Sequence, residues 1–478
     1  MKNQLSQLIE KLRKDFDVPS IMVSVHKDGE TFFCGGGLAD VENNYEATPD
    51  TIYAIASASK AFIATALCIL ADEGKLTLDD PVKKHLPDFA MHEEYMTNNL
   101  TIRDALGHRS GLPRHDLTWL NNPNITIYEI IDNLKHLPLA FPPRARMHYQ
   151  NHMFALASVI VEKISGMTWQ KFVKEKILDP LGMISTYTAA LDYRDLSLKT
   201  ASEPYELKDG ELKKMKFNVL DNMGAAGCLN STVRDLDKWA RLQLGKGEFE
   251  GKRIYSEEMA KNLHNPQMII KEKEMFPYEF EEVDFTSYGQ GWFIESYRGH
   301  KLVHHGGTID GYKSLVGFLP NSGVAFSILT NLNGNQTPMA IGYGICDLAL
   351  GLSEIDWGSR FMEFKNQMET EAKNRLDELR AKGENAPPPT HSLSDYAGTY
   401  THAAYGSFTV TCEDDSLYID VIDNRYSLVA IGYNNFFIDF QRYLMGVPVK
   451  FDYDHDGKIC KMLVKAEQMC DMIEFIVS

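Results

Sequence analysis

Two residue types that together perform nucleophilic chemistry lie one helical turn apart near the start of the chain. Ser57 and Lys60 form the pattern Ser-x-x-Lys, and an apolar run follows the lysine as far as Leu70. The run predicts a buried helix, on which positions three apart share a face. A serine hydroxyl needs a base to become a nucleophile, and an apolar environment makes a lysine give up its proton more easily. The pair is therefore a candidate nucleophile and proton acceptor for acyl transfer.

Two further motifs follow in the chain. Tyr149-Gln150-Asn151 stands just before a second apolar helix, and His305-Gly306-Gly307 stands at the end of a predicted strand. Ser-x-x-Lys, Tyr-x-Asn and His-x-Gly in this order resemble the serine β-lactamase and penicillin-recognising hydrolase superfamily. Within it the chain resembles the class C β-lactamase-like branch, which includes DD-peptidases, D-aminopeptidases and esterases. The resemblance covers roughly residues 5–350 and extends to three longer segments, Leu100–Asp116, Ala225–Leu242 and Asp310–Asn331.

The resemblance implies a role for each motif residue. Ser57 would accept the acyl group, with Lys60 and Tyr149 as its proton-transfer partners; which of the two deprotonates the serine stays open. Asn151 would hydrogen-bond the substrate amide and the lysine. The backbone N–H groups of Ser57 and Thr308 would form the oxyanion hole. The small residues Gly306 and Gly307 would let substrate lie against the strand edge.

His305 departs from the β-lactamase pattern. β-Lactamases usually carry a lysine at this place, where it helps to bind a substrate carboxylate, whereas DD-peptidases, D-aminopeptidases and some esterases of the family carry histidine. A neutral imidazole binds a carboxylate less strongly than a permanent cation does. We therefore expect β-lactamase activity to be weak at most, and peptide or ester substrates to be favoured.

The pattern of elements predicts an α+β fold with a central antiparallel sheet flanked by helices. Alternating residues at 20–37 predict a hairpin, and strand character returns at 288–297, 301–304, 313–319 and 324–331. Both ends of the first 352 residues thus contribute to one β-lactamase-like domain. A mostly helical subdomain at about 75–265 lies between them, with a helix start at Ser231 or Thr232.

A change of pattern marks the C-terminal part of the chain. Residues 353–392 predict a helix and a Pro-rich linker, and residues 393–478 predict six to eight short strands in a small antiparallel β-barrel. The segment HSLSDYAGTYTHAAYGSFTV resembles the start of the lipocalin-like domain of D-aminopeptidase-type proteins. In those proteins this domain packs near the active-site cleft and limits access.

Composition excludes several classes of partner. The chain has 478 residues, with 49 basic against 66 acidic side chains and a net charge of −17, which argues against nucleic acid or an anionic membrane. We see no signal peptide and no apolar run of membrane-spanning length. The seven cysteines are scattered and form no CxxC. These features predict a cytoplasmic protein with reduced thiols.

Cofactor sites are not expected. His148 and His152 have helical spacing, but no HExxH and no third ligand accompany them, so we expect no metal. The acidic turn at 452–457 lacks the glutamate of a calcium loop and predicts a hairpin turn.

The sequence therefore predicts a serine hydrolase that cleaves amide bonds of small peptides or D-amino-acid derivatives through an acyl-enzyme. A carboxylesterase or acyltransferase is the alternative within the fold, and a catalytically silent penicillin-binding sensor is the alternative from another class. The expected partner is a small molecule or short peptide, and homo-oligomer formation stays open.

Overall fold

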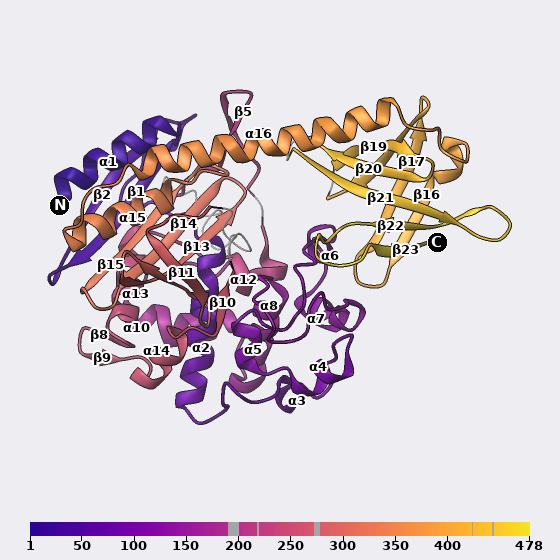
Figure 1. Ribbon diagram of the computed structural model, residues 1–478. Coiled ribbons are helices and arrows are strands. Elements are labelled where there is room, and N and C mark those ends of the chain that lie inside the picture. The colour runs from indigo at the N-terminus through magenta and orange to yellow at the C-terminus, as the bar shows by residue number, and fades with distance from the viewer. Residues whose placement is uncertain (190–199, 218, 272–277, 423, 442–443) are drawn as a thin grey trace. The chain divides into compact units, whose positions relative to one another are not determined.

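The computed structural model describes residues 1–478 except 190–199, 218, 272–277, 423 and 442–443 (Figure 1). The described chain packs into two compact units. The first contains Met1–Phe89, Asn98–Ser110 and Pro143–Met362, and the second contains Ala90–Thr97, Gly111–Pro142 and Glu363–Ser478. The helices of this described part include none with the length and apolarity needed to cross a membrane.

An antiparallel sheet forms the centre of the first unit. Among the described residues it has nine strands in the order β10-β11-β12-β13-β14-β15-β1-β2-β3. Their bounds are Met268–Ile270 (β10), Val283–Tyr288 (β11), Phe293–Tyr297 (β12), His300–Ile309 (β13), Tyr312–Leu319 (β14), Val324–Thr330 (β15), Ser20–Lys27 (β1), Glu30–Asp40 (β2) and Tyr45–Glu46 (β3). β1 pairs with β15, so both ends of the unit's chain meet in one sheet, as the α+β prediction requires.

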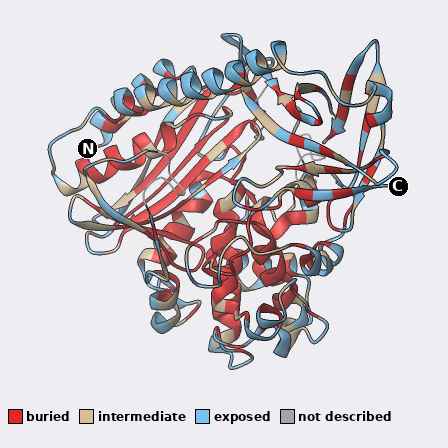
Figure 2. Cartoon of the chain, turned by 45° about the vertical axis from the view of Figure 1, so that its right-hand side comes forward, coloured by how far each residue is buried: buried red, intermediate tan, exposed pale blue. Residues whose placement is uncertain are grey.

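Helices cover both faces of this sheet (Figure 1). On one face, α1 (Lys2–Asp15) and α15 (Thr337–Leu350) bury apolar residues against the inward side chains of β1, β14 and β15. On the other face, α13 (Val233–Leu244) packs against β15 and β1, and α2 (Lys60–Asp72) packs against α8 (His152–Ser165). Thr232 caps α13 through its side chain, which confirms one of the two predicted start residues. The strands and the helices around them are largely buried (Figure 2).

Shorter elements complete the first unit. They are β4 (Tyr53–Ala54), η1 (Ala56–Ser59), α3 (Val82–His85), α5 (Ile102–Leu106), α9 (Trp169–Val173), η3 (Lys174–Leu178), α10 (Asp179–Leu181), β5 (Tyr205–Lys208), β6 (Glu211–Lys214), η4 (Asp221–Met223), α12 (Gly224–Gly227), β7 (Asn230–Ser231), β8 (Glu248–Phe249), β9 (Lys252–Arg253) and α14 (Glu257–Leu263). β4 pairs with β7, which joins the chain just before η1 to the chain just after α12.

The prediction of one continuous strand at 288–297 was wrong. β11 ends at Tyr288 and β12 begins at Phe293, and the two strands pair with each other. The turn between them packs against α2, where a Cβ on Gly291 would lie 3.2 Å from the Ala64 Cβ and where φ is +78°. A glycine in the left-handed region is suited to this reversal.

A closed antiparallel barrel dominates the second unit. Its strands are β16 (Gly398–His402), β17 (Gly406–Glu413), β18 (Ser416–Val421), β19 (Asn424–Gly432), β20 (Asn435–Phe440), β21 (Met445–Tyr453), β22 (Ile459–Val464) and β23 (Ile473–Val477). The turn at 454–458 joins β21 to β22, as the hairpin prediction requires. The residues that follow Met362 in α16 (Trp357–Glu384) also belong to this unit.

A segment far away in sequence completes the second unit. Residues 111–142 carry α6 (Leu117–Leu120), α7 (Ile127–Asp132) and η2 (Asn133–His136). The His115 Nδ1 atom lies 2.6 Å from the Tyr405 hydroxyl, and the Ile422 N–H donates to the Asn121 side chain at 2.9 Å. The barrel and this helical segment therefore share side-chain contacts.

Candidate active site

A strained turn presents Ser57. η1 begins with Ala56, whose φ of +47° lies in the left-handed region that non-glycine residues rarely adopt. The Ser59 hydroxyl holds the turn, because it donates to the Ala56 carbonyl at 2.6 Å and accepts from the Leu229 N–H at 3.1 Å. Strain of this kind persists only where the surroundings fix it, and it is concentrated at functional sites.

Lys60 lies fully buried one turn later. Its Nζ atom is 3.1 Å from the Ser57 Oγ, 2.8 Å from the Asn151 Oδ1 and 2.7 Å from the Ala226 carbonyl oxygen. The structure thus brings the first motif together with the asparagine of the second.

These three partners suit two protonation states of the amine. The Asn151 and Ala226 oxygens can only accept, whereas the Ser57 hydroxyl can donate or accept. An ammonium at Lys60 donates to all three oxygens, and a neutral amine donates to two and accepts the Ser57 proton. A proton can therefore pass between serine and lysine without any movement of heavy atoms.

Tyr149 packs beside the amine in an aromatic cluster. Its ring centroid lies 4.9 Å from the Lys60 Nζ and 4.4 Å from the centre of the His108 ring. Tyr288 and Phe293 also pack against Tyr149. The phenol is thus in the neighbourhood that its predicted proton-transfer role requires, and that role stays a prediction.

The edge of β13 forms the other side of the site. β12 pairs with β13 only as far as His304, and within the described chain the stretch from His305 to Ile309 pairs with β14 alone. η1 packs against this stretch. A Cβ on Gly307 would lie 2.0 Å from the Ile55 carbonyl oxygen, so the Ser57 turn and the strand can approach this closely only because residue 307 has no side chain. Thr308 follows on the same strand and is exposed.

Both ring nitrogens of His305 form hydrogen bonds within the protein. Its Nε2 atom lies 3.0 Å from the Tyr288 hydroxyl and its Nδ1 atom lies 2.6 Å from the Gly306 carbonyl oxygen. The ring is buried, and burial together with the charge of Lys60 lowers the pKa of His305 to about 3. The imidazole is therefore uncharged at any ordinary pH.

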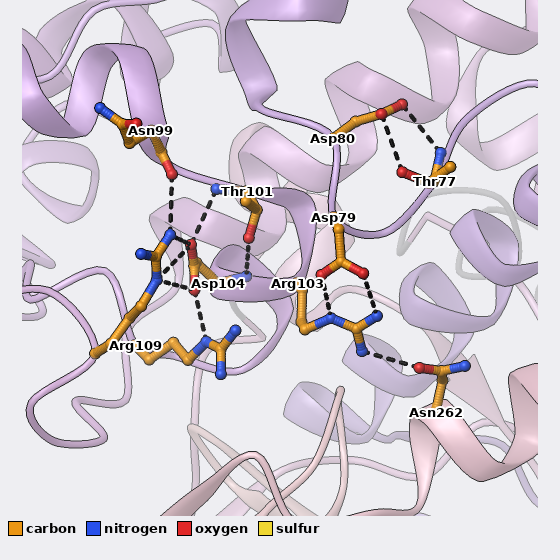
Figure 3. Close-up of polar contacts among 10 residues, drawn as sticks. Thr77, Asp79, Asp80, Asn99, Thr101, Arg103, Asp104, Arg109 and Asn262 are labelled. Carbon is orange, nitrogen blue, oxygen red and sulfur yellow. Dashed lines mark hydrogen bonds and ion pairs between the residues drawn. The ribbon is translucent and has the colours of Figure 1, made fainter.

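Asp104 is the centre of a buried ion-pair network, and Figure 3 shows the contacts around this carboxylate. The Asp104 carboxylate, fully buried, accepts from Arg109 at 2.6 Å and from Arg144 at 2.7 Å. The two arginine backbones are also joined, since the Arg144 N–H donates to the Arg109 carbonyl at 2.8 Å. Asp104 therefore fastens the chain just before Tyr149 to the chain that carries His108.

Several residues of the site escaped the sequence analysis. Ala226 contributes only a backbone carbonyl, which leaves no side-chain signal, although its segment is one of those that carry the family resemblance. Tyr288 was assigned only to the start of a predicted strand, and His108 and Asp104 were noted only within a longer segment. The glycines on either side of Gln290 could have indicated a turn just after Tyr288.

Comparison with known proteins identifies the family. Residues 5–344 match the Beta-lactamase family, and residues 382–475 match a family described as Domain of unknown function (DUF3471). The chain belongs to the Beta-lactamase family, and this membership together with the Ser57–Lys60 pair makes it a serine hydrolase.

Individual relatives agree with this assignment. An unguisins hydrolase from Aspergillus campestris is 28% identical over 448 residues, which cover 89% of this chain and 80% of the relative. An octameric penicillin-binding protein homologue from Pyrococcus abyssi matches with a TM-score of 0.66 at 24% identity over 99% of both chains. A D-amino acid amidase from Ochrobactrum anthropi SV3 matches with a TM-score of 0.61 at 23% identity, covering 76% of this chain and 99% of the amidase. The two structural likenesses establish the fold.

Proposed function

We propose that the protein hydrolyses amide bonds of small peptides or D-amino-acid derivatives through an acyl-enzyme on Ser57. The observation that carries the proposal is the buried Lys60 amine, which joins the Ser57 hydroxyl to Asn151 and Ala226. This arrangement can take a proton from the serine and return it to a leaving group.

The proposed reaction has two halves. Ser57 Oγ forms a bond to the substrate carbonyl carbon while its proton passes to the Lys60 and Tyr149 pair. The N–H groups of Ser57 and Thr308 stabilise the negative oxygen. The carbon–nitrogen bond then breaks and the amine leaves with the proton. Water attacks the acyl-enzyme in the second half, one water proton returns to Ser57, and the acid is released.

The substrate class is supported by the nature of the relatives and by His305. The structural neighbours include a D-amino acid amidase, and the sequence relatives include a protein named as a hydrolase. A neutral imidazole at residue 305 gives a β-lactam carboxylate no cation, which supports weak turnover of nitrocefin. The octameric description of the Pyrococcus abyssi relative supports homo-oligomer formation, which the sequence leaves open and which stays a prediction.

The test compares Ser57→Ala with Ser327→Ala on one substrate panel. Ser327 is a matched control because its buried hydroxyl also makes a hydrogen bond, to Ser24 at 2.6 Å, but it lies on β15, which β14 separates from β13. The panel holds D- and L-aminoacyl p-nitroanilides, D-Ala-D-Ala peptides, p-nitrophenyl esters and nitrocefin. We expect turnover of D-aminoacyl p-nitroanilides by the wild type and by S327A, and a loss of at least about a thousandfold in kcat for S57A.

Other outcomes separate the alternatives. Turnover of esters without amides would identify a carboxylesterase of the same fold. A lasting mass adduct with a fluorophosphonate or penicillin, without turnover of any substrate, would identify a silent sensor. Equal turnover by S57A and the wild type would overturn the assignment of the nucleophile.

A further inference from the structure

A chain of two hydrogen bonds fixes the hydrogen positions on His305. A carbonyl oxygen can only accept, so the contact of 2.6 Å between Nδ1 and the Gly306 oxygen places the ring proton on Nδ1. A neutral imidazole carries one N–H, so Nε2 is an acceptor. The Tyr288 hydroxyl, 3.0 Å from Nε2, must then be the donor.

The surroundings shield Tyr288 and His305 from solvent and favour the uncharged imidazole. Tyr288 is 0% exposed and His305 is 1% exposed. Phe293 packs against both rings, with centroids 4.8 Å from Tyr288 and 5.2 Å from His305. The titratable neighbours of the imidazole are Lys60 on α2, Tyr149 before α8, Tyr288 on β11 and His304 on β13. None of these four supplies a negative charge at neutral pH that would favour an imidazolium.

The chain of hydrogen bonds ends on the strand edge that faces Ser57. The His305 Nδ1–H group holds the Gly306 carbonyl and with it the peptide plane between Gly306 and Gly307. Thr308, whose N–H is the second proposed oxyanion donor, follows directly. Tyr288 therefore acts on this strand through His305 rather than through contact with the substrate.

We propose that Tyr288 is a positioning residue that holds His305 as the neutral Nδ1–H imidazole. The site thereby selects substrates in which the group beside the scissile bond is an uncharged carboxamide or ester rather than a free carboxylate. The inference rests on the proposed function and deepens it. A lysine at residue 305 would offer a carboxylate three donors and a charge, whereas this imidazole has its one N–H and its one acceptor already engaged inside the protein.

The first test observes the ring directly and does not depend on activity. Two-dimensional ¹⁵N–¹H spectra of full-length protein labelled at its 15 histidines report which ring nitrogen carries the proton. His305→Gln identifies the signals of residue 305. We expect a protonated Nδ1 and an unprotonated Nε2 that stay unchanged between pH 5 and 8, and Tyr288→Phe should shift the Nε2 signal. A proton on Nε2, or titration within that range, would overturn the inference.

The second test measures substrate selection with a matched pair, D-Phe-D-Ala and D-Phe-D-Ala amide. We expect the wild type to prefer the amide by at least about tenfold in kcat/KM, and Tyr288→Phe to narrow this preference by at least about threefold. The narrowing arises because the released Nε2 atom can take up a proton when a carboxylate is bound.

A control variant separates positioning from stability. Tyr255 is buried, and its hydroxyl donates to Gln243 at 2.7 Å, outside the aromatic cluster of the site. Tyr255→Phe should therefore lose stability as Tyr288→Phe does while leaving the amide preference and the His305 signals unchanged. Equal preferences in Y288F and the wild type would contradict the inference. Absence of turnover on both dipeptides would count against the proposed function, and the spectra would still decide the state of His305.

Discussion

Removal of the buried charge at Asp104 tests how the segment that carries Tyr149 is held in place. Burial alone would raise the pKa of this carboxyl, but hydrogen bonds from Arg144 and Thr101 and the charge of Arg109 outweigh it and hold the pKa below its ordinary value. A carboxylate with a lowered pKa contributes stability that is fully present above the unfolded pKa of about 4 and is lost as pH falls below it. At pH 7 the contribution of Asp104 is therefore complete.

The size of the effect follows from burial. Breaking a buried ion pair by removing one partner costs about 3–5 kcal/mol. Arg109 and Arg144 are 18% and 41% exposed, so water can solvate part of their charge once the carboxylate is gone. We therefore expect Asp104→Asn to lower the free energy of unfolding by about 2–4 kcal/mol.

The neighbouring pair of Figure 3 is a matched control. Asp79 accepts from Arg103 in a bidentate geometry at 2.6 and 2.8 Å, but its side chain is 68% exposed (Figure 3). Asp79→Asn removes the same charge and should lower the free energy of unfolding by only about 0–1 kcal/mol.

Urea unfolding at pH 7 measures both variants. Tryptophan fluorescence follows mainly the first unit, which contains Trp169, Trp239, Trp292 and Trp357. A difference below about 1 kcal/mol between D104N and D79N would refute the argument that burial makes Asp104 the stronger support. Steady-state kinetics adds a second measure. We expect a lower kcat in D104N, because Tyr149 is displaced there, and an unchanged kcat in D79N, where Tyr149 stays in place.

Two further predictions concern the strand edge and the barrel. Gly307→Ala should lower kcat/KM at least about a hundredfold, because its Cβ would lie 2.0 Å from a backbone oxygen. Gly306→Ala, with its nearest atom at 3.2 Å, should lose less, and equal losses in steady-state assays would contradict this reasoning. Burial raises the pKa of the Glu467 carboxyl to about 7. The folded state therefore binds the carboxyl proton more tightly than the unfolded state does, and the free energy of unfolding should fall as the pH rises from about 4.3 to 7. In thermal melts, the melting temperature should depend less on pH for Glu467→Gln than for the exposed control Glu474→Gln. Equal pH profiles of the two variants would rule out a stabilising proton on Glu467.

Much of the fold could be predicted because its signals are local. The hairpin at 20–37 alternates and turns at Asp28-Gly29, and β1 and β2 are found there. In the barrel, β19 carries only a weak strand signal. Its burial pattern alternates only weakly, because several of its residues are half-exposed, and a period of two is then hard to detect.

The site was predictable where side chains carry the chemistry. Ser57, Lys60 and Asn151 each belong to a motif that precedes or begins an apolar helix, and they converge because these two helices, α2 and α8, pack together. Ala226 and the Gly306 carbonyl act through the backbone, whose direction depends on pairing and turns rather than on residue type. The hydrogen positions on His305 likewise depend on Tyr288, which lies on a strand that the sequence did not separate from its neighbour.

The closeness of the Ser57 turn and β13 depends on one backbone oxygen. The Ile55 carbonyl accepts from the Ser314 hydroxyl at 2.7 Å and occupies the space that a side chain at residue 307 would fill. Ser314 is the cross-strand partner of Gly307 on β14, so the register of two strands sets where the turn lies. A shift of one residue in this register would move Ser314 to the other face of the sheet. The distance between the serine hydroxyl and the strand edge is therefore encoded in sheet pairing, and the three motifs alone do not contain it.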